Sequence, residues 1–304
     1  MAASTASAVQ EMHDWSSSSG PIMTYLQYYE VSLEYFLERA GLWVAMFVVW
    51  WAVSLVVSST FRGLKPQARV FWALALVRAV FGGLFAPLGV YCGFVGMRDG
   101  SIVSVSSPLS TWLICNAIGF FVFECFALFA SNIVFAQFDL LLFIHHVISL
   151  GGFSAILYTG HLHYFGVLGL ILECSTPFTA LSWISWRMGY ETTTLWRANQ
   201  MLMVHMFHGR SFIEAFVWIQ TFRYWHQLST ELSWLSILAF YPSLALMSFL
   251  LTPSWLLKKT RQLNNKPITR EQAWRAIWDP DMQTPASVPV AKVEPKDKRR
   301  LKTM

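Results

Sequence analysis

Long apolar stretches, separated by short polar ones, dominate the chain between residues 40 and 257. A helix needs about 20 mostly apolar residues to cross the hydrocarbon core of a bilayer. The stretches of this kind are 40–59, 70–95, 109–130, 138–158, 163–186, 198–222 and 233–257. We therefore predict an all-α integral membrane protein, a polytopic bundle of about seven transmembrane helices. Six spans with a re-entrant segment are the alternative, because few polar residues separate the third stretch from the fourth.

The composition narrows the class of protein further. Hydrophobic residues make up 55% of the chain and aromatic residues 16%, whereas only 13% are charged. A soluble domain carries about a quarter charged residues. A water-soluble enzyme, a disordered protein and a nucleic-acid binder are therefore excluded.

Charge divides the chain into regions. Residues 1–257 carry ten Lys/Arg and twelve Asp/Glu, whereas residues 258–304 carry twelve and five. The basic excess therefore belongs to the C-terminal end, where proline and charged residues predict disorder. We predict an acidic N-terminal segment (1–38), a transmembrane domain (39–262) and a disordered basic tail (263–304).

Basic residues in the short loops predict the orientation, because they concentrate on the cytosolic side of a membrane. Segment 61–69 holds three of them and the start of the tail, 258–261, holds three more, whereas the second and sixth loops hold one each. With seven spans the richer loops share one side, so the N-terminus is luminal and the C-terminus cytosolic. The tail ends in KRRLK at 298–302, similar to a dibasic retrieval signal of the endoplasmic reticulum. A polybasic segment that binds anionic headgroups is the alternative.

Ionisable residues inside the predicted spans are candidates for function, because each costs a few kcal/mol in the bilayer. They are Arg78, Glu124, His145, His146, Glu173, His205, His208, Arg210 and Glu214. His145 and His146 are adjacent, so they point about 100° apart on a helix and can border one cavity. Histidine serves as a general base near neutral pH. We predict His145, His146, Asp139 and Glu173 as catalytic residues, with structural hydrogen bonding as the alternative.

A second polar group lies in residues 201–214. His205 and His208 are three residues apart and share a helix face, which could meet the histidine pair in the bundle core. Arg210 and Glu214 are four apart on roughly the opposite side, and we predict an ion pair between them. His205, His208 and Arg210 are our candidates for substrate binding.

Pro177 is the fourth substrate-binding candidate. A proline inside a span removes a backbone hydrogen bond and kinks the helix. The carbonyl that it leaves unpaired is that of Glu173, which would place a free acceptor beside the Glu173 carboxylate. Such kinks can line cavities, although a packing kink is an equal alternative.

The histidines also raise the hypothesis of a metal centre. Residues 141–144 precede the histidine pair and are all apolar, so they provide no metal ligand. His161 and His163 are two residues apart, which is the wrong spacing for one helix face. We therefore predict no metal and no bound cofactor.

Three short motifs resemble the TLC domain family, which includes ceramide synthases and the translocating-chain-associated membrane protein. They are DLLLFIHHVISL at 139–150, ECSTPF at 173–178 and FHGR at 207–210. They occur in the family's order, and the resemblance covers about residues 65–262. It implies a TLC-type transmembrane domain.

Within that family, the chain is most similar to an endoplasmic reticulum branch linked to a neuronal ceroid lipofuscinosis. The similarity rests on RAVFG at 78–82, LMVHMFH at 202–208 and the basic C-terminus. It implies residence in the endoplasmic reticulum, with cycling to the Golgi intermediate compartment. It also implies a part in phospholipid or sphingolipid metabolism and in the export of lysosomal enzymes.

The resemblance to ceramide synthases implies that His145 and His146 move an acyl group from acyl-coenzyme A to a lipid acceptor. Those enzymes carry aspartates in a later helix where this chain offers only Glu173, so a phospholipid-type hydroxyl acceptor suits it as well as a sphingoid amine. Three hypotheses stay open, each compatible with a homo-oligomer. They are an acyltransferase acting on membrane lipids and acyl-coenzyme A, a receptor for lysosomal enzymes as cargo, and a non-catalytic lipid-sensing accessory subunit.

Overall fold

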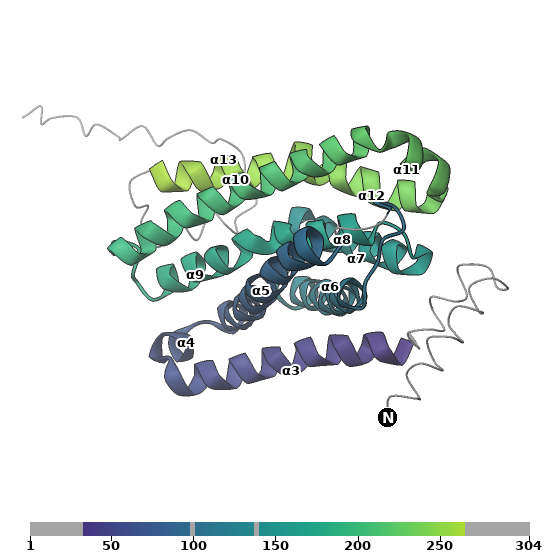
Figure 1. Cartoon of the computed structure of the whole chain (residues 1–304). Coiled ribbons are helices and arrows are strands. Elements are labelled where there is room, and N and C mark those ends of the chain that lie inside the picture. The colour runs from purple at the N-terminus through teal and green to yellow at the C-terminus, as the bar shows by residue number, and fades with distance from the viewer. Residues whose placement is uncertain (1–32, 98–100, 137–139, 265–304) are drawn as a thin grey trace, which may run out of the picture. The chain divides into compact units, whose positions relative to one another are not determined.

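The computed structural model describes residues 33–97, 101–136 and 140–264, and every regular element in these ranges is a helix (Figure 1). The elements are α3 (Leu33–Val57), α4 (Ser59–Gly63), α5 (Pro66–Tyr91), a π turn η1 (Cys92–Gly96), α6 (Pro108–Phe135), α7 (Leu140–Thr159), α8 (His163–Ile171), a 3-10 turn η2 (Leu172–Ser175), α9 (Thr176–Arg187), α10 (Thr194–Arg223), α11 (Trp225–Glu231), α12 (Trp234–Leu246), a π turn η3 (Met247–Leu251) and α13 (Thr252–Asn264). Asp139, most of the predicted N-terminal segment and the tail beyond Asn264 lie outside the described residues.

Six helical segments in the described ranges are long and apolar enough to cross a membrane. They are Phe36–Val57, Pro66–Gly96, Pro108–Phe135, Leu140–Thr159, His163–Arg187 and Trp234–Asn264. The stretch 198–222 lies in α10, whose 30 residues span about 45 Å, but its polar side chains leave it less apolar than these six. The prediction of an all-α polytopic membrane protein is confirmed.

The third and fourth spans are separate helices. α6 ends at Phe135, and Ala136 follows it in the left-handed conformation with φ of 51°. Such a residue is a common helix terminator, because it directs the chain away from the helix axis. α7 then begins at Leu140 and packs against α6.

The helix starts follow local rules that the sequence displays. Ser107 caps α6 by accepting a hydrogen bond from the Ser110 N–H, while the Ser110 hydroxyl accepts one from the Ser107 N–H. Pro108 occupies the first turn of α6, where a missing N–H costs nothing. Thr193 caps α10 in the same way, by accepting from the Trp196 N–H.

α5 packs against both α8 and α9, and two glycines bring the fifth span close to it. A Cβ atom at Gly82 would lie 2.5 Å from the Glu173 carbonyl oxygen, and one at Gly89 would lie 2.7 Å from that of Val167. Small residues of this kind allow helix backbones to approach each other closely inside membranes. The backbone of η2 is thereby held directly against α5.

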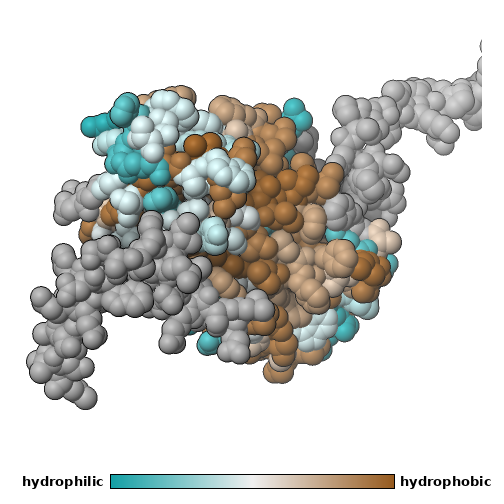
Figure 2. Space-filling model, turned by 90° about the vertical axis from the view of Figure 1, so that its right-hand side faces the viewer, coloured by the Kyte–Doolittle hydropathy of each residue, from teal (hydrophilic) through white to brown (hydrophobic). Residues whose placement is uncertain are grey.

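The outer surface is largely apolar. Figure 2 shows hydrophobic residues over much of the face that it presents, with hydrophilic residues most numerous at its upper left and others along its edges. Large side chains such as Val56, Phe126, Phe212 and Phe249 are among the exposed ones. A soluble protein would bury groups like these, whereas lipid tails solvate them.

Candidate functional site

The fifth span is broken near its middle. α8 ends at Ile171, the 3-10 turn η2 follows, and Pro177 lies in the first turn of α9. The break is thus where Pro177 predicts it. The prediction that the Glu173 carbonyl is unpaired is wrong, because its oxygen accepts a hydrogen bond from the Thr176 N–H. The 3-10 turn has replaced the lost helical bond with a shorter-range one.

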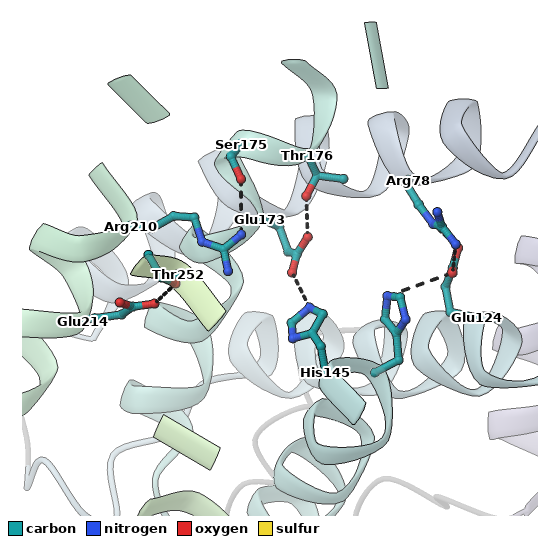
Figure 3. A network of polar contacts seen from close by, with 10 residues as sticks. Arg78, Glu124, His145, Glu173, Ser175, Thr176, Arg210, Glu214 and Thr252 are labelled. Atoms are coloured by element: carbon teal, nitrogen blue, oxygen red, sulfur yellow. Dashed lines mark hydrogen bonds and ion pairs between the residues drawn. The ribbon is translucent and has the colours of Figure 1, made fainter. Parts of the chain in front are cut away.

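This break places the Glu173 carboxylate opposite α7 (Figure 3). Glu173 Oε1 lies 3.6 Å from His145 Nε2. Its other oxygen, Oε2, accepts a hydrogen bond of 2.6 Å from the Thr176 hydroxyl. Both His145 and Glu173 are buried, and His145 Nδ1 has no hydrogen-bond partner among the described residues. An imidazole held in this way by a carboxylate is oriented for proton transfer at its other nitrogen.

His146 points to a different partner, although it is adjacent to His145. Its Nε2 lies 4.0 Å from Glu124 Oε2 on α6. Glu124 is held by Arg78 of α5, which donates from Nε to Oε1 at 3.0 Å and from Nη2 to Oε2 at 2.6 Å. Three helices are thus joined by one buried polar cluster, Arg78–Glu124–His146.

An internal cavity opens beside His145, between α7, α8, α10 and α12. Its empty space amounts to about 730 Å³, including its open end. The lining is mostly apolar, and includes Phe121, Phe153, Ile156, Phe165, Leu168, Ile213, Val217, Phe240, Leu244 and Met247. His145, Glu173 and Glu214 are the ionisable side chains that line it, together with the hydroxyls of Ser149 and Ser243. His146 is not part of its wall, so the two histidines do not border one cavity.

Arg210 and Glu214 do not form the predicted ion pair. Arg210 Nη1 donates to the Ser175 hydroxyl at 3.2 Å, and Glu214 Oε1 accepts a hydrogen bond of 2.6 Å from the hydroxyl of Thr252. Spacing by four residues permits an ion pair on one helix, but here each side chain finds a partner on a neighbouring element. Both residues are buried.

His205 and His208 are close together, with ring centroids 6.3 Å apart, but they do not meet the histidine pair. Both residues are exposed on the outside of α10. Their Nδ1 atoms donate to carbonyls of their own helix, that of Met201 at 2.7 Å and that of Val204 at 2.9 Å. The expectation of a shared core is wrong for these two, because the inward face of α10 carries Arg210 and Glu214.

The sequence reasoning missed two contributors from α13. Thr252 binds Glu214, and the indole of Trp255 contacts His145 with ring centroids 5.5 Å apart. A threonine and a tryptophan in an apolar stretch give no signal of such a role. The described residues contain no group of three or more His, Cys, Asp or Glu side chains arranged to hold a metal ion.

A helical bundle with an apolar surface and a largely apolar cavity lined by a His–Glu pair defines a multi-pass membrane protein with an internal site. This chain belongs to the CLN8 protein family. Over 73% of its length it is 36% identical to Protein CLN8 of Homo sapiens and of Canis lupus familiaris, and 38% identical to that of Mus musculus. The matched regions cover 79%, 78% and 77% of those proteins. No family model and no solved structure matches the chain.

Proposed function

We propose that this protein is a histidine-dependent acyltransferase of the endoplasmic reticulum membrane. In this proposal it moves a fatty acyl group from acyl-coenzyme A to a hydroxyl or amine of a phospholipid-type or sphingoid acceptor. The observation that supports it is the pair of His145 and Glu173 in the wall of a largely apolar cavity. The acyl chain needs an apolar environment, and the reacting carbonyl needs polar groups beside it.

The pair suits general base catalysis. Glu173 faces Nε2 of His145, which favours the tautomer with its proton on Nε2 and leaves the Nδ1 lone pair free. Nδ1 would take the proton of the acceptor hydroxyl as that oxygen attacks the thioester carbonyl. When the C–S bond breaks, the proton passes to the departing thiolate, so the products are an ester and free coenzyme A. The distance of 3.6 Å is longer than a hydrogen bond, as is common before substrate tightens a site.

The lining of the cavity agrees with a lipid chain as its occupant. Ligand pockets are lined mainly by apolar side chains, with a few polar groups among them. The wall of this cavity consists largely of aromatic and aliphatic residues. Glu214 adds a second carboxylate to the wall, which could accept a hydrogen bond from the acceptor lipid.

The cavity also weighs against a purely accessory role. A lipid-sensing subunit whose polar residues only join helices would have those groups mutually satisfied. Arg78 and Glu124 fit that description, because they pair directly. Nδ1 of both His145 and His146 is buried without a hydrogen-bond partner among the described residues, but of these two histidines it is His145 that lines the cavity.

For orientation, we propose a luminal N-terminus and a cytosolic C-terminus. Helix α4, the α9–α10 connection and the C-terminal end of α13 lie at the same end of the bundle (Figure 1). These segments carry the basic loops, with Arg62 in α4, Arg187 at the end of α9 and Arg261 in α13. Clustered positive charge is typical of a cytosolic side. Protease protection of an epitope at either terminus in sealed microsomes tests this assignment.

The function itself is tested by lipid analysis of cells that lack the protein, rescued with wild type, His145→Ala or His205→Ala at matched expression. His205 is the matched control, because it is a histidine of the spanning region that lies on the outer surface. We expect wild type and His205→Ala to restore a phospholipid or ceramide change that His145→Ala does not. Equal rescue by His145→Ala would point instead to a cargo receptor or a sensor.

A further inference from the structure

Arg210 carries a buried guanidinium group that is only partly used. The residue is 3% exposed and lies on the inward face of α10. Its Nη1 atom donates to Ser175, but Nε and Nη2 have no hydrogen-bond partner among the described residues. An unpaired polar group inside a membrane protein is costly, and a charged one more so. Such a group is available to bind a ligand.

The unused atoms form the guanidinium edge that binds oxyanions. Nε–H and Nη2–H point the same way and match the two oxygens of a carboxylate or phosphate. Arg78 demonstrates this geometry in the same protein, because its Nε and Nη2 atoms hold both oxygens of Glu124. Arg210 keeps the same edge buried, with no hydrogen-bond partner in the described part of the chain.

The carboxylates near Arg210 do not form a close ion pair with it. Glu173 and Glu214 are the nearby carboxylates (Figure 3), yet neither forms an ion pair with Arg210, and each is engaged by a threonine hydroxyl. Two aromatic rings stack on the guanidinium, with Cζ 5.3 Å from the Phe207 centroid and 5.4 Å from that of Trp255. These rings fix the plane of the guanidinium without occupying its edge.

Trp255 links this site to the candidate catalytic pair. Its indole packs on Arg210 and also contacts His145. A group bound at Arg210 would therefore sit one aromatic ring away from the reacting centre. The Nε and Nη2 atoms are shielded from solvent, so an oxyanion reaches them only when a neighbouring side chain moves.

We propose that the Nε/Nη2 edge of Arg210 binds a phosphate oxyanion of the acceptor, so that the acceptor is a phosphate-bearing lipid or lipid precursor. This inference rests on the proposed function, because the lipid is an acceptor only if the protein transfers an acyl group. Binding of the phosphate itself does not depend on acyl transfer. A free phosphate and a lipid phosphate present the same oxygens, and the experiment separates them.

The test measures binding to the purified full-length protein in an uncharged detergent. The probes are lysophosphatidic acid, the monoacylglycerol with the same chain, which lacks only the phosphate, and inorganic phosphate. The variants are Arg210→Gln, Arg210→Lys, His145→Ala and Arg223→Gln. Arg223 is the matched control, an exposed arginine in the last turn of the same helix.

We expect wild type to bind lysophosphatidic acid at least about tenfold more tightly than the monoacylglycerol. Arg210→Gln should abolish this preference, and Arg210→Lys should weaken it, because lysine keeps the charge but lacks the planar fork. Arg223→Gln and His145→Ala should retain it. Competition by inorganic phosphate would show that phosphate alone is recognised, and its failure to compete would assign the site to the lipid-borne group.

An unchanged preference in Arg210→Gln, or no preference in wild type, would overturn the proposal. If Arg210→Gln fails to fold, Arg210→Lys still decides, since it preserves the charge next to Glu173 and Glu214. If His145→Ala loses acyl transfer but still binds lysophosphatidic acid, phosphate binding and acyl transfer are separate properties of the protein. Retained binding with no acyl transfer by wild type would refute the function and leave the phosphate site standing.

Discussion

The ion pair between Arg78 and Glu124 gives the sharpest prediction about stability. Glu124 has 0% side-chain exposure and Arg78 has 18%. Removing one member of a buried pair leaves the other charge uncompensated and costs about 3–5 kcal/mol. Glu124→Gln leaves the Arg78 charge unpaired within a membrane-spanning helix, and Arg78→Met leaves the buried carboxylate unpaired. We expect each single variant to lose about 3–5 kcal/mol.

The assay is reversible unfolding of the purified protein in mixed micelles, with the free energy of unfolding compared between variants. The control is the double variant Arg78→Met/Glu124→Met, which removes both charges and keeps most of the side-chain volume. It should recover most of the loss, because no unpaired charge remains. Equal stability of either single variant and wild type would refute this reasoning, as would a double variant no more stable than the single ones.

Two further substitutions test the packing around the site. Gly82→Ala places a Cβ atom 2.5 Å from the Glu173 carbonyl oxygen, so we expect a loss of about 1–3 kcal/mol in the same unfolding assay; an unchanged value would contradict the close approach of α5 and η2. Gly152→Leu extends a side chain into the cavity and should shift the acyl chains found in the product lipid towards shorter ones in mass spectrometry. Its neighbour Gly151 faces open space, so Gly151→Leu is the control, and identical chain profiles for the two variants would argue against the cavity as an acyl site.

The spans could be predicted from the sequence because the thickness of a bilayer sets the length of the apolar stretches. All six segments that satisfy the length and composition of a span overlap predicted ones. The stretch in α10 differs because its inward face must supply Arg210 and Glu214 to the interior. Those polar residues lower its apolar character without shortening the helix.

The residues of the candidate site were visible as ionisable groups in apolar stretches, but their partners were not. Helix geometry separates the directions of His145 and His146, and does not say which neighbours each will meet. Glu173 reaches His145 through the break in the fifth span, whereas Glu124 reaches His146 from α6. These pairings depend on how helices distant in sequence pack together.

Residue spacing also could not say which face of α10 looks inward. The three-residue interval between His205 and His208 correctly predicts that they are neighbours. The choice between the histidine face and the Arg210–Glu214 face depends on the contacts of α10 with α9 and α13. Trp255, on α13, shows the same limit, because its role follows from position alone.

The central claim is that His145, and not His146, performs chemistry in the cavity. The most direct measurement is transfer of a labelled palmitoyl group from palmitoyl-coenzyme A to lysophosphatidic acid by the purified protein, with wild type, His145→Gln and His146→Gln compared per folded molecule. We predict transfer by wild type, at least about a hundredfold loss in His145→Gln, and near wild-type turnover for the folded fraction of His146→Gln. Transfer that survives in His145→Gln, or none by wild type with either a lysophospholipid or a sphingoid acceptor, would contradict the account.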